Sequence, residues 1–131
     1  MIRCIRMWTG TDGHSVFEEG HIAFGAGLHG KASGLPIAVR ELSFQETPAG
    51  GSFEWHQAPQ RQFVMTLSGT LEFEVRSGAT FIVHPGDVVI AQDDSGSGHR
   101  WRLIGEEPWR RAYAVYDADA DLHFKPRDQQ A

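Results

Sequence analysis

The chain has 131 residues, of which 40% are hydrophobic and 22% are charged, and its formal net charge is −5 at pH 7. This size and balance are typical of one globular domain, and the negative charge disfavours nucleic acid as a partner because phosphate binding needs a surplus of Lys and Arg. The chain has no apolar run of the roughly 18 residues that cross a membrane, no signal peptide and only one cysteine, Cys4, so we expect a cytoplasmic protein without a membrane partner.

The first predicted strand spans residues 1–8, where apolar and charged side chains alternate. It has no obvious hairpin neighbour in the sequence, which makes it a predicted edge strand. Residues 25–36 contain four glycines and one proline, a composition that favours a loop. We therefore interpret residues 1–36 as an N-terminal arm, and residues 125–131 as a frayed polar tail.

Short stretches of alternating apolar and polar residues fill the rest of the chain, each bounded by Gly, Pro, Asp or Ser. The predicted strands are 37–45, 53–56, 62–67, 71–76, 80–83, 88–91, 100–104 and 111–116. Many short strands without a helical stripe indicate an all-β sandwich or barrel, and a jelly-roll closure hides the strand edges at this length. We expect a single domain over residues 1–131 with a barrel core at about 37–116.

One motif in the middle of the chain has a specific spacing. Five residues separate Gly50 from His56, three separate Ala58 from Gln62, and six separate Gln62 from Gly69. This spacing resembles the first motif of the cupin superfamily, which reads Gly, five residues, His-x-His, three or four residues, Glu, six residues, Gly. Here Ala58 replaces the second His of the family pattern and Gln62 replaces its Glu.

A second stretch resembles the other cupin motif. The turn Pro85-Gly86-Asp87 matches its start, and His99 matches its histidine, two residues later than in the general pattern. The resemblance covers roughly residues 37–116 and points to the small bacterial cupins. It implies a jelly-roll barrel of the double-stranded β-helix type and activities such as those of dioxygenases, isomerases, lyases and decarboxylases.

The candidate site follows from the motif and from strand parity, because residues two apart in a strand share a face. We expect His56, Gln62 and His99 to converge inside the barrel. Two neutral imidazoles and an amide oxygen can bind a divalent transition metal such as Fe, Mn, Ni or Zn. The alternative interpretation is that the two histidines are interior side chains that only form hydrogen bonds. Glu54 shares the parity of His56 and is a candidate general base or fourth metal ligand.

Polar residues near this site have two interpretations each. Asp93 and Asp94 either orient a ligand histidine or serve only as turn residues. Arg61 either clamps a substrate carboxylate or, as its strand parity favours, points outward. The only local basic cluster is diluted by acidic neighbours and is predicted to be a solvated surface; its members are Arg100, Arg102, Arg110 and Arg111.

Two functions remain open at this stage. The first is a metal-dependent enzyme that acts on a small polar molecule, with the metal as a Lewis acid. The second is a non-catalytic binding module for a sugar or a small organic acid, which the reduced set of ligands favours. Fold alone does not separate these functions, because function depends on the site.

The sequence also predicts a homodimer. Phe63, Met65 and Leu67 form an apolar row on the face assigned away from the barrel interior, and such a row marks an interaction surface when it is exposed. The sequence shows no obvious partner strand for residues 1–8 within the same chain, so we expect a second copy to pair with this strand. Alternatively, residues 1–8 cover the apolar row within one chain.

Overall fold

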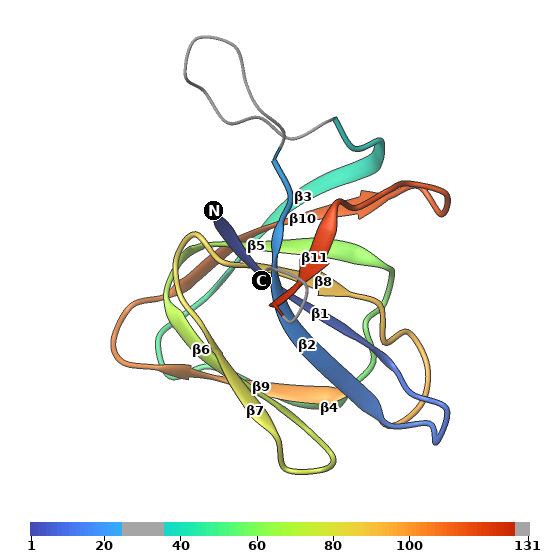
Figure 1. The fold of residues 1–131 in the computed structure, drawn as a ribbon. Coiled ribbons are helices and arrows are strands. Elements are labelled where there is room, and N and C mark those ends of the chain that lie inside the picture. Colours follow the sequence, from blue (N-terminus) through green and yellow to red (C-terminus); the bar gives the residue numbers. More distant parts are fainter. Residues whose placement is uncertain (25–35, 128–131) are drawn as a thin grey trace, which may run out of the picture.

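The computed structural model describes residues 1–24 and 36–127, and these form eleven strands in two sheets that face each other (Figure 1). The larger sheet has the order β11-β2-β1-β8-β5-β10-β3, and the smaller sheet has the order β4-β9-β6-β7. The strands are β1 (Ile2–Thr9), β2 (Ser15–Ile22), β3 (Val39–Thr47), β4 (Ser52–His56), β5 (Gln62–Ser68), β6 (Thr70–Val75), β7 (Thr80–Val83), β8 (Val88–Ala91), β9 (His99–Ile104), β10 (Trp109–Tyr116) and β11 (Phe124–Pro126). The all-β jelly-roll prediction is confirmed, and the predicted strands between residues 37 and 116 agree with the observed ones within two residues.

The core lies between the two sheets and follows from strand alternation. In β6, Leu71, Phe73 and Val75 are buried, whereas Glu72 and Glu74 on the opposite face are only partly buried. The inward side chains of β6 pack with those of the larger sheet, where Val64, Val89 and the N-terminal residues Ile5 and Met7 are buried in the same cluster. Alternation with a period of two therefore sets which side chains form the barrel interior.

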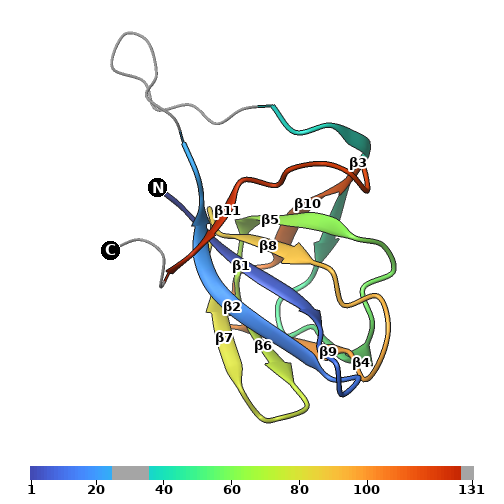
Figure 2. The same ribbon diagram turned by 45° about the vertical axis from the view of Figure 1, so that its right-hand side comes forward.

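The N-terminal segment is part of the barrel, so the prediction of an arm over residues 1–36 is wrong for its first part. β1 pairs antiparallel with β2 and parallel with β8, with Cys4 opposite Gly20 on one side and Val88 on the other. Figure 2 shows β1 between these two strands. The pairing with β8 joins segments about 80 residues apart, which local alternation does not reveal. Residues 25–35, where the sequence predicts a loop, lie outside the described residues.

The apolar row predicted on the outer face is covered over part of its length by the same chain. Phe63 packs with buried Cys4 on β1 and with Tyr116 on β10, and residues 120–124 lie against this cluster as β11 pairs with β2. Of this row, only Leu67 is largely exposed, at 57%.

Burial also raises the pKa of the Cys4 thiol to about 12, which agrees with a structural rather than a nucleophilic cysteine.

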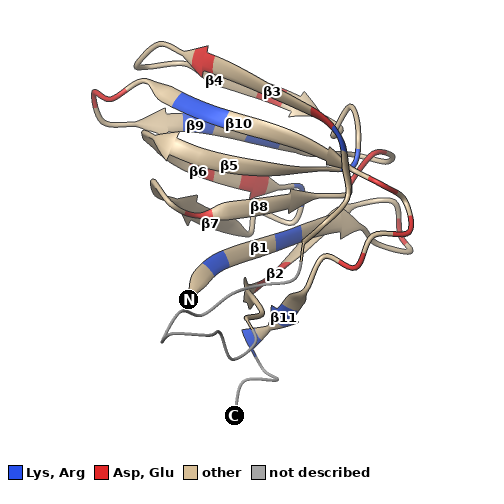
Figure 3. Ribbon diagram, turned by 90° about the horizontal axis from the view of Figure 1, so that it is seen from above, with Lys and Arg blue, Asp and Glu red and all other residues tan. Residues whose placement is uncertain are grey.

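The charges on the smaller sheet are paired across strands, and Figure 3 shows acidic and basic positions distributed over several strands. Arg100 on β9 pairs with Glu74 at 2.6 Å, and Arg102 pairs with Glu72 at 3.0 Å. These arginines form the solvated surface that the sequence predicts. The described part of the chain contains no helix able to span a membrane.

A close backbone approach holds β9 against the end of β4. Gly98 has a φ of +73° and lies directly over the backbone of His56, so that a Cβ at this position would overlap the carbonyl oxygen of His56. Gly78 has a similar φ of +93°, but a Cβ there would have no neighbour within 4 Å. The two glycines therefore share one conformational requirement and differ in packing.

We predict that Gly98→Ala destabilises the protein at least twice as much as Gly78→Ala. Both variants force an alanine into the left-handed region at a cost of about 1–2 kcal/mol, but only Gly98→Ala also displaces the backbone of His56. Thermal unfolding of both variants beside the wild type measures this difference, at about 2–8 °C of Tm per kcal/mol for small and mid-sized domains. An equal decrease in Tm for the two variants would show that the close approach of Gly98 to His56 does not contribute to stability.

Candidate functional site

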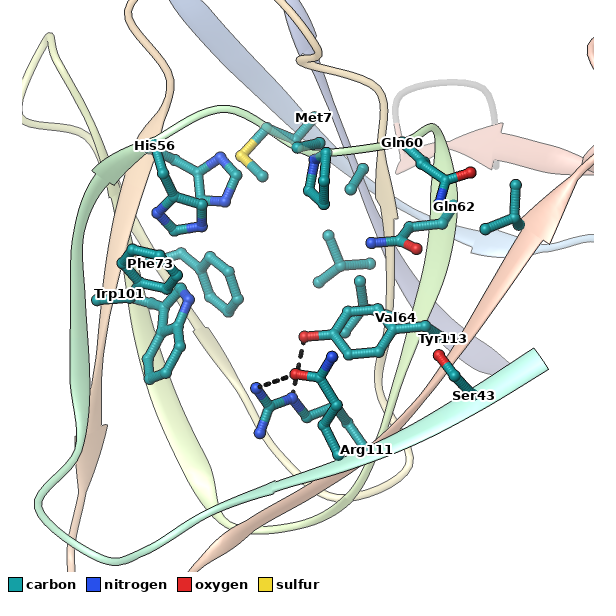
Figure 4. Close-up of a pocket in the computed structure, with 18 of the residues that line it drawn as sticks. Met7, Ser43, His56, Gln60, Gln62, Val64, Phe73, Trp101, Arg111 and Tyr113 are labelled. Atoms are coloured by element: carbon teal, nitrogen blue, oxygen red, sulfur yellow. Dashed lines mark hydrogen bonds between the residues drawn. The ribbon is translucent and has the colours of Figure 1, made fainter. Parts of the chain in front are cut away.

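A cavity of about 310 Å³ lies between the two sheets and has walls of different chemistry (Figure 4). His56 on β4 and His99 on β9 line one wall, with Phe73 and Trp101 beside them. The larger sheet contributes polar groups to the other walls, and these are Gln45 on β3, Gln62 on β5, and Arg111 and Tyr113 on β10. This volume is at the lower end of the range for small-molecule sites.

The two histidines are neighbours because β4 and β9 pair antiparallel with His56 opposite His99. Their ring centroids are 4.5 Å apart. His99 is buried and His56 is half-buried, and Phe53 stacks on the ring of His56 with the centroids 4.0 Å apart. The predicted meeting of His56 and His99 inside the barrel agrees with this geometry.

The hydrogen bonds of the two rings determine which nitrogen each presents. The Nδ1 of His99 lies 2.6 Å from Oδ2 of Asp93, and the Nδ1 of His56 lies 2.7 Å from the carbonyl oxygen of Glu54. A carbonyl oxygen and a carboxylate both accept, so each Nδ1 carries a proton and donates it. In the neutral imidazoles the Nε2 lone pairs are then free to bind a metal or accept a proton, since no described residue hydrogen-bonds to either Nε2.

Burial also favours the neutral form of His56. It lowers the pKa of this imidazole, and the neighbouring His99 lowers it further, while the hydrogen bond to the carbonyl of Glu54 opposes the shift. A depressed pKa keeps the Nε2 lone pair available at neutral pH, which is the form that a metal ligand requires.

The structure separates the roles of Asp93 and Asp94, which the sequence left open. Asp93 is fully buried, and its Oδ2 accepts a hydrogen bond from the hydroxyl of Ser15 at 2.6 Å as well as from His99. Asp94 instead forms an exposed ion pair with Arg61 at 3.1 Å. Asp93 therefore orients His99, whereas Asp94 and Arg61 belong to the surface, in agreement with the strand parity of Arg61.

Gln62 and Glu54 occupy different places relative to the histidines. Gln62 is buried and lines the cavity, but Figure 4 shows it on a different wall from His56. Glu54 does not line the cavity, because a register shift between Phe53 and His56 disturbs the alternation of β4. Its side chain is 78% exposed and lies 3.8 Å from Arg100. The expectation that Glu54 faces the same space as His56 is therefore wrong.

Arg111 is a cavity-lining residue that the sequence analysis did not place in the site. It was assigned to a solvated basic cluster, but only 5% of it is exposed and its guanidinium lies on the cavity wall. It stacks 3.8 Å from the ring centroid of Trp109. Strand parity carries the signal that identifies it, since Trp109, Arg111, Tyr113 and Val115 alternate along β10 and all line the cavity.

The donor set for a metal is small. Its clearest members are the Nε2 atoms of His56 and His99, and a carboxylate–histidine hydrogen bond of the kind that supports metal ligands is present at Asp93. The described residues contain no group of three or more His, Cys, Asp and Glu side chains that could hold a metal ion. Two imidazoles are suitable ligand types for a divalent transition metal, but they would leave its remaining positions to water or to a bound ligand.

Several solved structures share similarity with this chain. A DUF861 family protein from Thermotoga maritima has 18% sequence identity and a TM-score of 0.48, over 58% of this chain and 80% of that one. An uncharacterised protein with a double-stranded β-helix domain from Klebsiella pneumoniae has 23% identity and a TM-score of 0.47, over 64% and 74%. The cupin domain of Cnp3 from Schizosaccharomyces pombe has 18% identity and a TM-score of 0.44, over 88% and 83%.

The family of the chain follows from a match over its central and C-terminal strands. No curated protein matches it. The family model described as "Cupin domain" matches residues 43–115, which is more than half of the chain and spans β4 through most of β10. The matched segment contains His56, Gln62 and His99, and the chain therefore belongs to the cupin family.

Proposed function

We propose that this cupin binds a divalent transition metal at His56 and His99 and acts as a metal-dependent enzyme on a small polar molecule in the cavity. The observation that supports this most directly is that both Nδ1 atoms are hydrogen-bonded, at 2.6 and 2.7 Å, while neither Nε2 atom has a hydrogen-bond partner among the described residues. Interior histidines with a purely structural role use both ring nitrogens more often, since unpaired buried polar atoms are costly.

A metal bound there would supply Lewis-acid chemistry to an oxygen of the substrate. The residues of the chain supply orientation and shielding from water. Asp93 fixes the ring of His99, and Phe73 and Trp101 form an apolar wall beside the histidines. We do not retain Glu54 as a general base, because its carboxylate lies outside the cavity.

The alternative function is a non-catalytic binding module for a sugar or a small organic acid. One observation favours it, namely that the described residues offer only two histidines at the cavity wall, fewer than the three protein ligands of a typical catalytic metal site. The family pattern has four ligands, and this chain has Ala58 and Gln62 in place of two of them. Metal content separates the two functions.

We predict that protein purified without chelator contains a divalent metal, held more weakly than by a four-ligand site. His56→Ala removes one of two imidazoles and is expected to lower bound metal about tenfold or more, because the remaining site has a single strong donor. Elemental analysis after dialysis measures the metal. The control is His84→Ala, which removes a histidine side chain that is 62% exposed and outside the cavity.

If the wild type stays metal-free in excess Zn, Ni, Mn and Fe, the metal-dependent proposal fails and the binding-module alternative replaces it. If His84→Ala loses as much metal as His56→Ala, the metal is bound nonspecifically.

We also propose a homodimer, with the interface on β3 instead of the N-terminal strand. An interface built on residues 1–8 and on the apolar row of Phe63, Met65 and Leu67 is not supported. The strand β1 is paired on both sides, and Phe63 is covered by its own chain. β3 is the last strand of the larger sheet among the described residues. Leu42 and Phe44 on its outer face are 58% and 67% exposed.

The sequence of β3 is self-complementary when two copies pair antiparallel. A two-fold axis at Ser43 would place Leu42 opposite Phe44 of the second copy and Arg40 opposite its Glu46. Apolar and opposite-charge pairs across strands each contribute roughly 0.2–1 kcal/mol, and each pair occurs twice in a symmetric dimer. Paired strands also satisfy the open edge of the sheet.

We predict that light scattering at micromolar concentration gives about twice the chain mass of 14.6 kDa. Phe44→Lys is expected to yield a monomer, because the charge would lie in the centre of the pairing. Val16→Lys, at an exposed apolar position on β2, is the matched control and should remain dimeric. A monomeric wild type, or equal dissociation of both variants, contradicts an interface at β3.

A further inference from the structure

Arg111 is a buried cation with no acidic partner among the residues that the structure describes. Its neighbour Arg110 points outward and pairs with Glu46 at 2.8 Å. In contrast, no carboxylate of residues 1–24 or 36–127 lies within 4 Å of the guanidinium nitrogens of Arg111. Burying an unpaired charge is expensive, and interior charges are normally paired or bound to an ion. The location of this cation on the cavity wall therefore requires an explanation.

Neutral groups satisfy most of the guanidinium but leave its charge uncompensated. Nε donates to the hydroxyl of Tyr113 at 3.0 Å, and Nη2 donates to Oε1 of Gln45 at 3.2 Å. Nη1 donates to the hydroxyl of Thr47 at 2.7 Å and to the carbonyl of Trp109 at 3.2 Å. These four bonds use four of the five N–H groups of an arginine, so one N–H of Nη2 remains for another acceptor.

Tyr113 provides a second donor beside this one. Its hydroxyl oxygen accepts from Nε of Arg111, which leaves the hydroxyl proton free to donate. No described residue accepts it, and Figure 4 shows the phenol and the guanidinium facing the same cavity. Two adjacent donors, one of them charged, match the two oxygens of a carboxylate. The ring of Trp109 on the other side of the guanidinium fixes its plane.

The rest of the cavity limits what the anion can be. Glu41 on β3 is the only acidic side chain of the described residues that lines the cavity, and it is exposed. Apolar side chains such as Val64, Phe73 and Val89 line the same cavity as the arginine and the histidines. A ligand that fills about 310 Å³ is therefore small, with an apolar body between two polar ends.

We propose that the cavity binds a small organic acid, with its carboxylate on Arg111 and Tyr113 and its body directed toward His56. This inference rests on the in-barrel site of the proposed function and names the substrate class of that site. Arg111 is the specificity-determining residue, because only an anionic ligand would compensate its buried positive charge. A neutral ligand of the same shape would leave that charge unpaired.

Benzoate and benzamide test this proposal, since they share a shape and differ in charge. In thermal-shift and calorimetric titrations, we expect benzoate to raise Tm and bind at least tenfold more tightly than benzamide. Arg111→Gln should abolish this preference, and Arg110→Gln, which removes the adjacent exposed arginine, should keep it. Tyr113→Phe removes only the hydroxyl and should weaken benzoate while leaving benzamide unchanged, which provides a test if Arg111→Gln fails to fold.

Equal affinity for the two probes, no binding of benzoate, or an equal loss in Arg110→Gln would overturn the proposal. Metal content measured on the same samples separates this result from the proposed function. Protein that holds metal but shows no carboxylate preference contradicts only the assignment of Arg111. Metal-free protein that still prefers benzoate through Arg111 contradicts only the metal site.

Discussion

The carboxylate of Asp93 connects parts of the fold that lie far apart in the sequence. It is fully buried, and its Oδ2 accepts hydrogen bonds from Ser15 at the start of β2 and from His99 at the start of β9. Its backbone carbonyl accepts from the amide of Ala58 at 3.0 Å, just beyond β4. Truncating Asp93 would leave the Ser15 hydroxyl and the His99 ring nitrogen without their acceptor, and each unsatisfied buried polar group costs about 1–3 kcal/mol. The same bonds therefore connect the start of β2 to the start of β9 and determine which nitrogen His99 presents to the cavity.

The two sheets supply different chemistry to one cavity. β4 and β9 bring two imidazoles whose Nε2 atoms have no hydrogen-bond partner among the described residues, whereas β10 brings a cation and a phenol (Figure 4). The imidazole lone pairs can bind a metal, and the positive charge of the guanidinium can bind an anion. The two walls are therefore complementary to a ligand with two different polar ends. The apolar residues that line the same cavity lower the local dielectric, which strengthens both interactions once water is excluded.

The sequence predicted the barrel well because alternation and turn residues are local signals. The positions of His56 and His99 were predictable for the same reason, together with motif spacing. Three features were not predictable from local patterns. The register shift at β4 turned Glu54 outward, the pairing of β1 with β8 spans most of the chain, and Arg111 was grouped with its sequence neighbours although its parity on β10 faces inward. Metal binding, dimerisation and the ligand remain predictions.

The proposed dimer and the proposed acid site meet on β3. Along this strand Leu42 and Phe44 face outward, while Ser43 and Gln45 line the cavity, and Gln45 accepts a hydrogen bond from Arg111. β3 has a partner on one side only among the described strands, and a strand paired on one side opens more easily than one paired on both. Pairing with a second copy would hold β3 in place, and with it the amide oxygen that orients the guanidinium. Dimer formation and anion binding would then stabilise each other, because both favour the same conformation of β3.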